Sequence, residues 1–176
     1  MRPVAWLAIG LVFATCGQNP AATSVPGAVS ATPLPATTLV VTDARERRVP
    51  AVLDGFPLTT VRVAEEEWLV AVADTGPRRR QGLMDVEDLG DLDGMLFAYD
   101  QPVVTTFGMR NTLIPLDIAF FDEQGELVGS LEMVPCTADP CPLYASPAPF
   151  RWALEAPAGL LTGLGLGDRL EISAQG

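Results

Sequence analysis

The sequence contains no histidine and no lysine, so all 11 of its basic residues are arginines. Without histidine, the chain cannot form a Ser-His-Asp or Cys-His catalytic arrangement, nor an imidazole metal site. Without lysine, it cannot form a Schiff base with a carbonyl substrate. These absences exclude most common nucleophilic mechanisms, and we expect the protein to use neither a metal nor a cofactor.

Positive charge is also scarce, because 22 acidic residues face those 11 arginines. The net charge of −11 and a pI near 4.2 argue against nucleic acid or an anionic membrane surface as the main partner. At 176 residues, the chain is long enough for one domain with a substantial core.

The N-terminus carries a 12-residue apolar run from Val4 to Thr15. This run is too short to span a bilayer, which takes about 20 residues, but it is typical of a signal peptide covering residues 1–15. Residues 13–16 (FATC) resemble a bacterial lipobox, in which Cys16 would be diacylated. We therefore expect an extracytoplasmic, membrane-anchored lipoprotein. Ordinary cleavage to give a periplasmic or secreted protein is the alternative.

Residues 16–58 are rich in proline, alanine and threonine over most of their length and show no clear periodicity. We interpret them as a tether rather than a domain. From Thr59 onward, short segments of β-branched and apolar residues alternate with turn-forming residues, which is typical of strands. Residues 59–176 are therefore expected to form a single mainly β domain, a sandwich or partly closed barrel with one or two short helices.

Two local signals mark the ends of elements within this domain. Residues 74–84 (DTGPRRRQGLM) predict a short helix, with Asp74 or Thr75 as its N-cap and Pro77 in its first turn. Residues 121–129 (FDEQGELVG) predict a hairpin whose turn lies at residues 122–125.

Asp117 lies within the apolar segment FGMRNTLIPLDIAFFD (residues 107–122). A buried carboxylate without a partner costs several kcal/mol or becomes protonated. We expect an arginine, Arg110 or Arg79, to pair with Asp117, because its planar guanidinium offers bidentate hydrogen bonds. A functional reading is open as well, in which Asp117 orients a ligand or acts as a general acid or base.

Glu155 in RWALEAP is a second acid within an apolar strand. Two carboxylates on facing strands are what glycoside hydrolysis requires, so Asp117 and Glu155 are candidates for a catalytic pair. Isolated acids in strands more often face the solvent.

Arg110 and Asn111 stand at the entrance to the segment that holds Asp117. Their side chains can bind a sugar or a carboxylate. Alternatively, Asn111 and Thr112 satisfy the backbone of a turn or bulge.

Cys136 and Cys141 flank four residues in PCTADPCP. In an exported chain this spacing favours a disulfide that closes a short loop. A metal site would need two further ligands, and the CxxC spacing of redox motifs is not met.

Several motifs follow one another in a specific order: RRRQGLM, GMLF, MRNTLIPLDIAFFD, PCTADPCPLY, LEAPAG and GD. In this order they resemble the bacterial family called domain of unknown function 192 (DUF192), over about residues 59–173. The resemblance implies a compact, mainly β domain, often behind a signal peptide, and it implies no activity. The family's recurrent polar positions fall on Arg79, Arg110, Asn111, Asp117, Tyr144, Glu155 and Asp168.

Three positions depart from the family pattern. Gly108 stands where the family often has tryptophan, Arg110 where it often has lysine, and Val86 where an arginine is common. If a family ligand stacks on that tryptophan or is held by that arginine, this protein binds it less well or binds something else.

The leading hypothesis is a non-catalytic binding or accessory module of the cell envelope. Its partner would be a small polar ligand or an envelope component, with contact to the membrane only through lipidated Cys16. The expected ligand site consists of Arg79, Arg110, Asn111, Asp117 and Tyr144. A carboxylate-based hydrolase of envelope glycans is the alternative function, and a purely structural domain is a third possibility.

Overall fold

The computed structural model describes residues 47–173, so the expected signal peptide, Cys16 and most of the expected tether lie outside the described residues. Nine strands form a seven-stranded sheet in the order β6-β5-β8-β3-β2-β1-β9 and a two-stranded sheet of β4 and β7. The elements are η1 (Ala51–Leu53), β1 (Leu58–Val63), β2 (Glu66–Ala73), α1 (Gly76–Gln81), β3 (Gly94–Val103), β4 (Thr106–Gly108), β5 (Leu116–Phe121), β6 (Leu127–Met133), β7 (Leu143–Ala145), β8 (Phe150–Pro157) and β9 (Leu170–Ile172).

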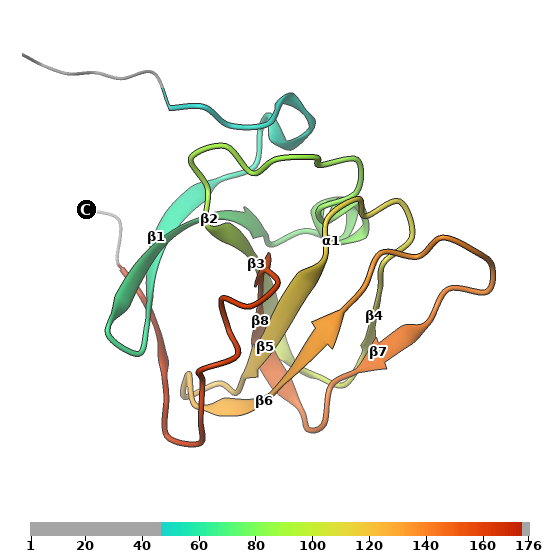
Figure 1. The fold of residues 1–176 in the computed structure, drawn as a ribbon. Helices are drawn as coiled ribbons and strands as arrows, with labels where there is room; N and C mark the ends of the chain where they lie inside the picture. Colours follow the sequence, from blue (N-terminus) through green and yellow to red (C-terminus); the bar gives the residue numbers. More distant parts are fainter. Residues whose placement is uncertain (1–46, 174–176) are drawn as a thin grey trace, which may run out of the picture. The chain divides into compact units, whose positions relative to one another are not determined.

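The large sheet is antiparallel except where β2 pairs with β3 in parallel. A parallel pair needs a crossover connection, and the segment containing α1 provides it. The sheet curls into a half-barrel, with β4 and β7 standing apart as a small second sheet (Figure 1). The expected mainly β, partly closed barrel is confirmed.

Helix α1 is bounded by the residues that its sequence favours. The Thr75 side chain accepts a hydrogen bond of 3.4 Å from the Arg78 amide, and a proline follows in the first turn. Gly82 has a φ of +49° and donates its N–H to the Arg78 carbonyl, which ends the helix. The helix is therefore shorter than the predicted range of 74–84.

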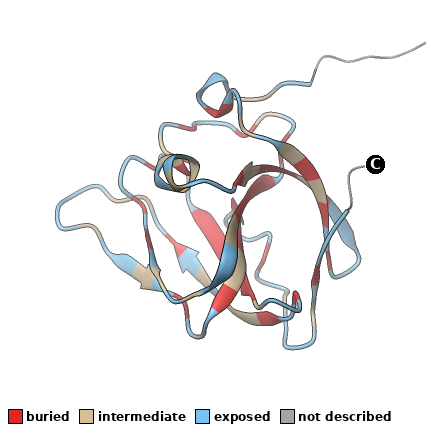
Figure 2. Ribbon diagram, turned by 180° about the vertical axis from the view of Figure 1, so that it is seen from behind, coloured by how far each residue is buried: buried red, intermediate tan, exposed pale blue. Residues whose placement is uncertain are grey.

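The central strands of the large sheet are largely buried (Figure 2), and most of their buried residues are apolar. Strand β5 is buried along its whole length. Ile118 and Phe120 belong to the first hydrophobic cluster, and Ala119 and Phe121 belong to the second. Since successive strand residues point to opposite faces, these two clusters lie on the two sides of the sheet.

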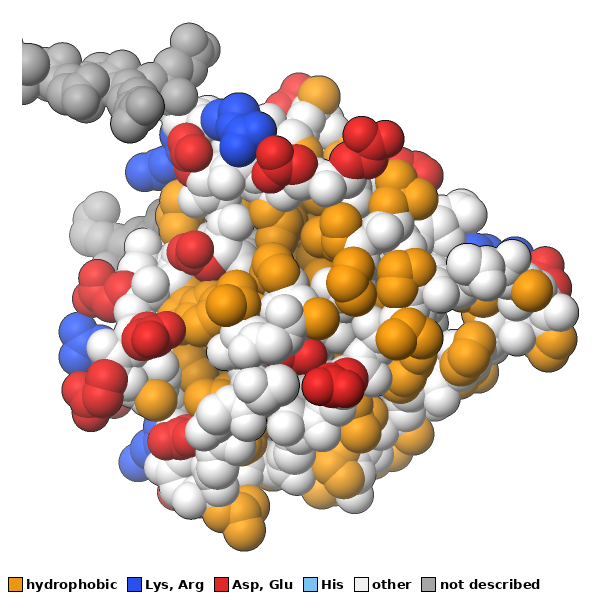
Figure 3. Space-filling view, in the orientation of Figure 1, with side chains coloured by type: hydrophobic (Ala, Val, Ile, Leu, Met, Phe, Trp, Pro, Cys, Tyr) orange, Lys and Arg blue, Asp and Glu red, His pale blue; other side chains and the backbone are white. Residues whose placement is uncertain are grey.

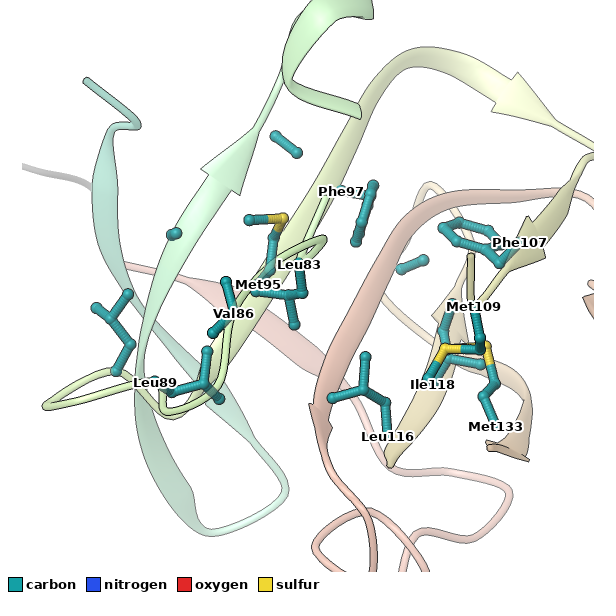
Figure 4. Close-up of a cluster of buried hydrophobic side chains, with 14 of the residues drawn as sticks. Leu83, Val86, Leu89, Met95, Phe97, Phe107, Met109, Leu116, Ile118 and Met133 are labelled. Carbon is teal, nitrogen blue, oxygen red and sulfur yellow. The ribbon is translucent and has the colours of Figure 1, made fainter. Parts of the chain in front are cut away.

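The first hydrophobic cluster extends beyond the sheet, to Leu83, Val86 and Leu89 after α1 and to Phe107 on β4 (Figure 4). Its aromatic rings pack edge-on or tilted, as in the contact of Phe97 with Phe107 at 5.2 Å. This cluster fixes the small sheet and the α1 segment against the same face of the large sheet.

Residues before Thr59 also belong to the packed structure. Leu53 of η1 is fully buried in the first hydrophobic cluster, and Val49 and Phe56 pack against it. The packed structure therefore begins before the expected boundary between residues 58 and 59.

The loops confirm two local predictions. Cys136 and Cys141 form a disulfide, and the Asp122 carboxylate accepts hydrogen bonds of 2.9 Å from the amides of Gln124 and Glu126 in the predicted turn. Within residues 47–173, no helix is both long and apolar enough to cross a bilayer.

Candidate functional site

Asp117 is buried, with 2% of its surface exposed, and its partners are backbone amides rather than an arginine. Its Oδ2 atom accepts hydrogen bonds from the amides of Gly159 (2.8 Å) and Leu161 (3.0 Å), while its Oδ1 atom has no partner in the described part of the chain. The expected pair with Arg110 or Arg79 is wrong. Two amides of the turn after β8 bind one oxygen of the carboxylate instead.

Asp117 and Glu155 do not face each other. On the paired strands β5 and β8, Asp117 lies opposite Ala156, and Ile118 lies opposite Glu155. Directly paired residues share a face, so the two carboxylates point to opposite sides of the sheet. The expected hydrolytic pair of Asp117 and Glu155 is therefore absent.

A cleft of about 710 Å³ opens on the face that carries Glu155. Strands β3 and β8 form its floor, the α1 segment forms one wall, and β4, β7 and the disulfide loop form the other. Its lining includes Arg79, Arg80, Met84, Phe97, Tyr99, Phe107, Arg110, Asp139, Cys141, Leu143 and Glu155.

Glu155 is the only carboxyl group on the floor of this cleft within residues 47–173. It is 6% exposed, and its neighbours across the strands, Met95 and Ile118, are fully buried and apolar. In the described part of the chain, no donor forms a hydrogen bond with its carboxyl group. Burial alone raises the pKa of Glu155 to about 8, because desolvation penalises the charged form.

Tyr99 and Arg79 line the same cleft as Glu155. The Arg79 guanidinium stacks over the Tyr99 ring at 4.6 Å, and its Nη1 donates to the carbonyls of Asp74 and Ala98, each at 2.7 Å. Burial raises the pKa of Tyr99, the Arg79 charge lowers it, and the Glu155 charge raises it. Arg79 thus fixes α1 against β3 and places positive charge at the cleft.

The opposite wall is held by the disulfide and by an ion pair. Arg110 binds the Asp139 carboxylate through both terminal guanidinium nitrogens, and Asp139 lies between Cys136 and Cys141. Arg80 makes no ion pair within residues 47–173, and it lines the cleft from the α1 side. Of the cleft's three arginines, Arg80 is therefore the most available to a ligand.

The other residues expected at the site lie elsewhere. Asn111 has a φ of +57°, and its carbonyl accepts the Asp85 amide, so it serves the turn that follows β4. The Tyr144 hydroxyl accepts a hydrogen bond of 3.2 Å from the Val134 amide. Neither Asn111 nor Tyr144 lines the cleft with Glu155, whereas Arg79 and Arg110 do.

Asp168 has a structural role, because its Oδ2 atom accepts the Gly165 amide at 2.8 Å within a turn. Across residues 47–173, no three acidic or cysteine side chains converge as a metal site would require.

Sequence reasoning missed Tyr99 and Arg80 as cleft residues. The alternation of β3 contains the signal for Tyr99, because Met95, Phe97 and Tyr99 occupy alternate positions and so share a face. Arg80 carries no such signal, since only the packing of α1 distinguishes it from its neighbours.

This fold and cleft define a small, mainly β half-barrel domain with a side-chain-lined pocket on one face of its sheet. The chain belongs to the DUF192 family, described as "Uncharacterized ACR", whose match covers residues 59–172. The resemblance found in the sequence motifs is thereby confirmed.

Two solved structures are similar to this chain. A protein from Sinorhizobium meliloti 1021, named a "putative transcription regulator", has a TM-score of 0.60 and 28% identity, over 66% of this chain and 95% of that one. A protein of unknown function from Novosphingobium aromaticivorans DSM 12444 has a TM-score of 0.61 and 30% identity, over 70% of this chain and 91% of that one. No curated protein matches the sequence.

Of the three residues that depart from the family pattern, two line the cleft and one lies in the core. Gly108 lines the cleft, and a Cβ atom there would meet the Leu143 side chain at an ordinary 3.4 Å. Arg110 lines the cleft and binds Asp139, which lies in the same wall. Val86 is buried in the first hydrophobic cluster. Two of the three departures therefore change the lining of the cleft itself.

Proposed function

We propose that this domain is a non-catalytic binding module that holds a small polar ligand in the cleft over Glu155. The observation that carries this proposal is a carboxyl group on the cleft floor with 6% exposure and no hydrogen-bond partner in residues 47–173. Its oxygens are not among the side-chain atoms that are fully enclosed without a partner, so they are open to the cleft and can pair with a ligand there. The centre of the proposed site is thus Glu155, with Arg79 and Arg110 retained from the sequence prediction.

The rest of the lining fits a small-molecule site. Aromatic and aliphatic side chains such as Phe97, Phe107 and Leu143 surround a few polar groups, and the volume of about 710 Å³ lies in the usual range for such pockets. The disulfide and the contacts of Arg79 hold the two walls.

A binding role is favoured over hydrolysis by the arrangement of the acids. Asp117 lies on the other face of the sheet, and the remaining acid of the cleft, Asp139, is paired with Arg110. A glycosidase needs two carboxyl groups on either side of one bond, and the described cleft offers Glu155 without a free second acid.

Our proposal includes export and attachment to a membrane through lipidated Cys16, with the domain acting at the cell envelope. The apolar run from Val4 to Thr15 and the FATC motif support it. The disulfide supports it as well, because disulfides persist in oxidising compartments outside the cytoplasm.

A nucleic-acid partner, which the name of the Sinorhizobium meliloti protein suggests, is not part of this proposal. The chain has a net charge of −11, and repulsion of phosphates opposes binding at physiological salt. On the face shown in Figure 3, acidic side chains gather along the upper and left edges and outnumber the arginines among them.

Thermal melting with a ligand panel tests the binding role. The purified chain would be melted alone and with small carboxylates, amines, neutral sugars and peptidoglycan fragments. We expect at least one class to raise the midpoint of the wild type but not that of Glu155→Ala, while Glu66→Ala, an exposed strand position, behaves like the wild type. An equal rise in Glu155→Ala, or no rise with any class, contradicts the proposed cleft function.

Metabolic labelling tests the anchor. The full-length chain would be expressed in a bacterial host supplied with labelled palmitate. We expect the label to be incorporated in the wild type and lost in Cys16→Ser, with the disulfide variant Cys136→Ser/Cys141→Ser as control. An unlabelled wild type contradicts lipidation, and leaves the cleft proposal unaffected.

A further inference from the structure

We infer that the ligand of this cleft is a small organic anion, which accepts a hydrogen bond from the Glu155 carboxyl group and has its charge balanced by Arg80. This inference rests on the proposed function and names its ligand class. It follows from the charge of the lining, from the lack of a partner for Glu155, and from the apolar walls.

The lining is positive although the protein is acidic. Three arginines line the cleft, against the two acids Asp139 and Glu155. Arg110 is paired with Asp139, and Arg79 donates to two backbone carbonyls, but Arg80 has no ion pair within residues 47–173. In a chain with a net charge of −11, a cleft of this sign favours an anion over a cation.

Glu155 supplies the hydrogen-bond donor. Burial raises its pKa to about 8, so the group is largely protonated at neutral pH and has one O–H to donate. Of its neighbours across the strands, the Ile118 side chain has no acceptor and Met95 offers only a weakly accepting thioether. A carboxylate oxygen of a ligand would accept it in a strong, charge-assisted hydrogen bond.

In the described part of the chain, the other titratable groups around the cleft make no hydrogen bond with Glu155. Tyr99 on β3 is a neutral phenol whose pKa is raised by burial, and the arginines are donors only. Asp139, on the opposite wall, is bound by Arg110. The titratable and charged groups that line the cleft with Glu155 are Tyr99 of β3, Arg79 and Arg80 of α1, and Arg110 and Asp139 of the disulfide-loop wall.

The apolar walls favour an organic anion over an inorganic one. Phe97, Phe107, Met84 and Leu143 present aromatic and aliphatic surface to the cleft. A carboxylate with a hydrocarbon or aromatic body buries that surface, whereas free phosphate does not.

Binding is consequently linked to a proton. The anion requires Glu155 in its protonated form, so affinity is constant well below pH ~8 and falls by up to about tenfold for each pH unit above it. Glutamine keeps an N–H donor at this position and cannot ionise. Glu155→Gln should therefore bind the anion with little dependence on pH.

The test uses benzoate and its neutral and cationic analogues, benzyl alcohol and benzylamine. Each would be titrated calorimetrically into the purified full chain at about pH 7 and about pH 9. We expect benzoate to bind more tightly than either analogue, and to lose about tenfold in affinity at the higher pH in the wild type but not in Glu155→Gln. Arg80→Gln should weaken benzoate severalfold, whereas Arg62→Gln, a surface control, should not.

Other outcomes overturn the inference in distinguishable ways. If benzylamine or benzyl alcohol binds better than benzoate, and Glu155→Ala abolishes that binding, the ligand class is wrong but the cleft function stands. If benzoate binding falls equally with pH in Glu155→Gln, the role of Glu155 as donor is wrong. If no probe of any class binds, and inorganic phosphate also fails, both the inference and the proposed function are contradicted.

Discussion

The carbonyl oxygen of Glu155 occupies the space that a Cβ atom on Gly94 would need. Gly94 is the first residue of β3, and β8 runs beside it with Glu155 opposite Met95. The absence of a side chain at residue 94 therefore lets β8 lie close to β3 at the strand position that carries the cleft carboxyl group.

Replacing Gly94 by alanine should destabilise the domain. The new methyl group meets backbone, which cannot rotate away, so β3 and β8 must separate or shift. Overpacking of this kind costs about 1–3 kcal/mol, and we expect a loss of that size in the free energy of unfolding measured with urea.

Gly163→Ala is the matched control for Gly94→Ala. A Cβ atom at residue 163 would meet no atom within 4 Å, so this substitution should change stability by less than about 0.5 kcal/mol. Equal effects at residues 94 and 163 would show that the contact with Glu155 does not determine the cost.

Glu155 should make the stability of the domain depend on pH in an unusual direction. Its pKa rises from 4.5, the ordinary value, to about 8 in the folded chain. Between these values the folded state retains a proton that the unfolded state has released, so stability falls as the pH rises. The contribution is complete below pH ~4.5, declines up to pH ~8, and amounts to on the order of 5 kcal/mol at most.

Urea unfolding at several pH values, compared between the wild type and Glu155→Gln, measures this contribution. The variant cannot ionise at this position, so it should gain stability relative to the wild type as the pH rises toward 8. Glu66→Gln, at an exposed strand position, should leave the wild-type profile unchanged. Parallel pH profiles for the wild type and Glu155→Gln would mean that Glu155 titrates near its ordinary pKa.

Asp117 should prove to be a structural residue that does not affect ligand binding. Alanine at this position removes the acceptor for the amides of Gly159 and Leu161, and should cost about 3 kcal/mol. Asparagine retains one oxygen acceptor and should cost about 1 kcal/mol. Both losses can be measured from urea unfolding, and folded Asp117→Asn should bind cleft ligands like the wild type.

Asp168→Asn is the control for Asp117→Asn, because Asp168 accepts a single amide in a partly exposed turn. We expect it to cost about 0.5 kcal/mol or less. Weakened ligand binding in a fully folded Asp117→Asn would place Asp117 back in the functional site.

Much of the fold could be predicted because its signals are local. The helix start at Thr75 and the turn at Asp122 depend on side chains that bind amides two to four residues away. The disulfide joins cysteines only five positions apart. Short segments of β-branched and apolar residues between turn-forming residues indicated the strands, and hence the mainly β class.

The site could be predicted only in part, because it depends on pairings between distant residues. The amides that bind Asp117 lie 42 and 44 positions along the chain, and no local pattern connects them. The cleft likewise joins α1 to β4 and β7, whose packing is decided by the first hydrophobic cluster. Arg110 could be included because of its family position, but its partner Asp139 is set by the folding of the disulfide loop.

The disulfide should contribute both to stability and to ligand affinity. Cys141, Pro140 and Asp139 form part of the cleft wall, and the disulfide closes the loop that carries them. In the double variant Cys136→Ser/Cys141→Ser, loss of this short closed loop should cost about 2 kcal/mol in the free energy of unfolding.

Affinity should fall in the same variant for a separate reason. Once the loop is released, Asp139 no longer holds Arg110 at one fixed position in the wall, and ligand binding must order both side chains. We expect a severalfold weaker affinity for benzoate, and a reducing agent should reproduce both effects in the wild type while leaving the double variant unchanged. If reduction lowers stability but leaves the affinity as it was, the disulfide loop supports the fold and is not a wall of the binding site.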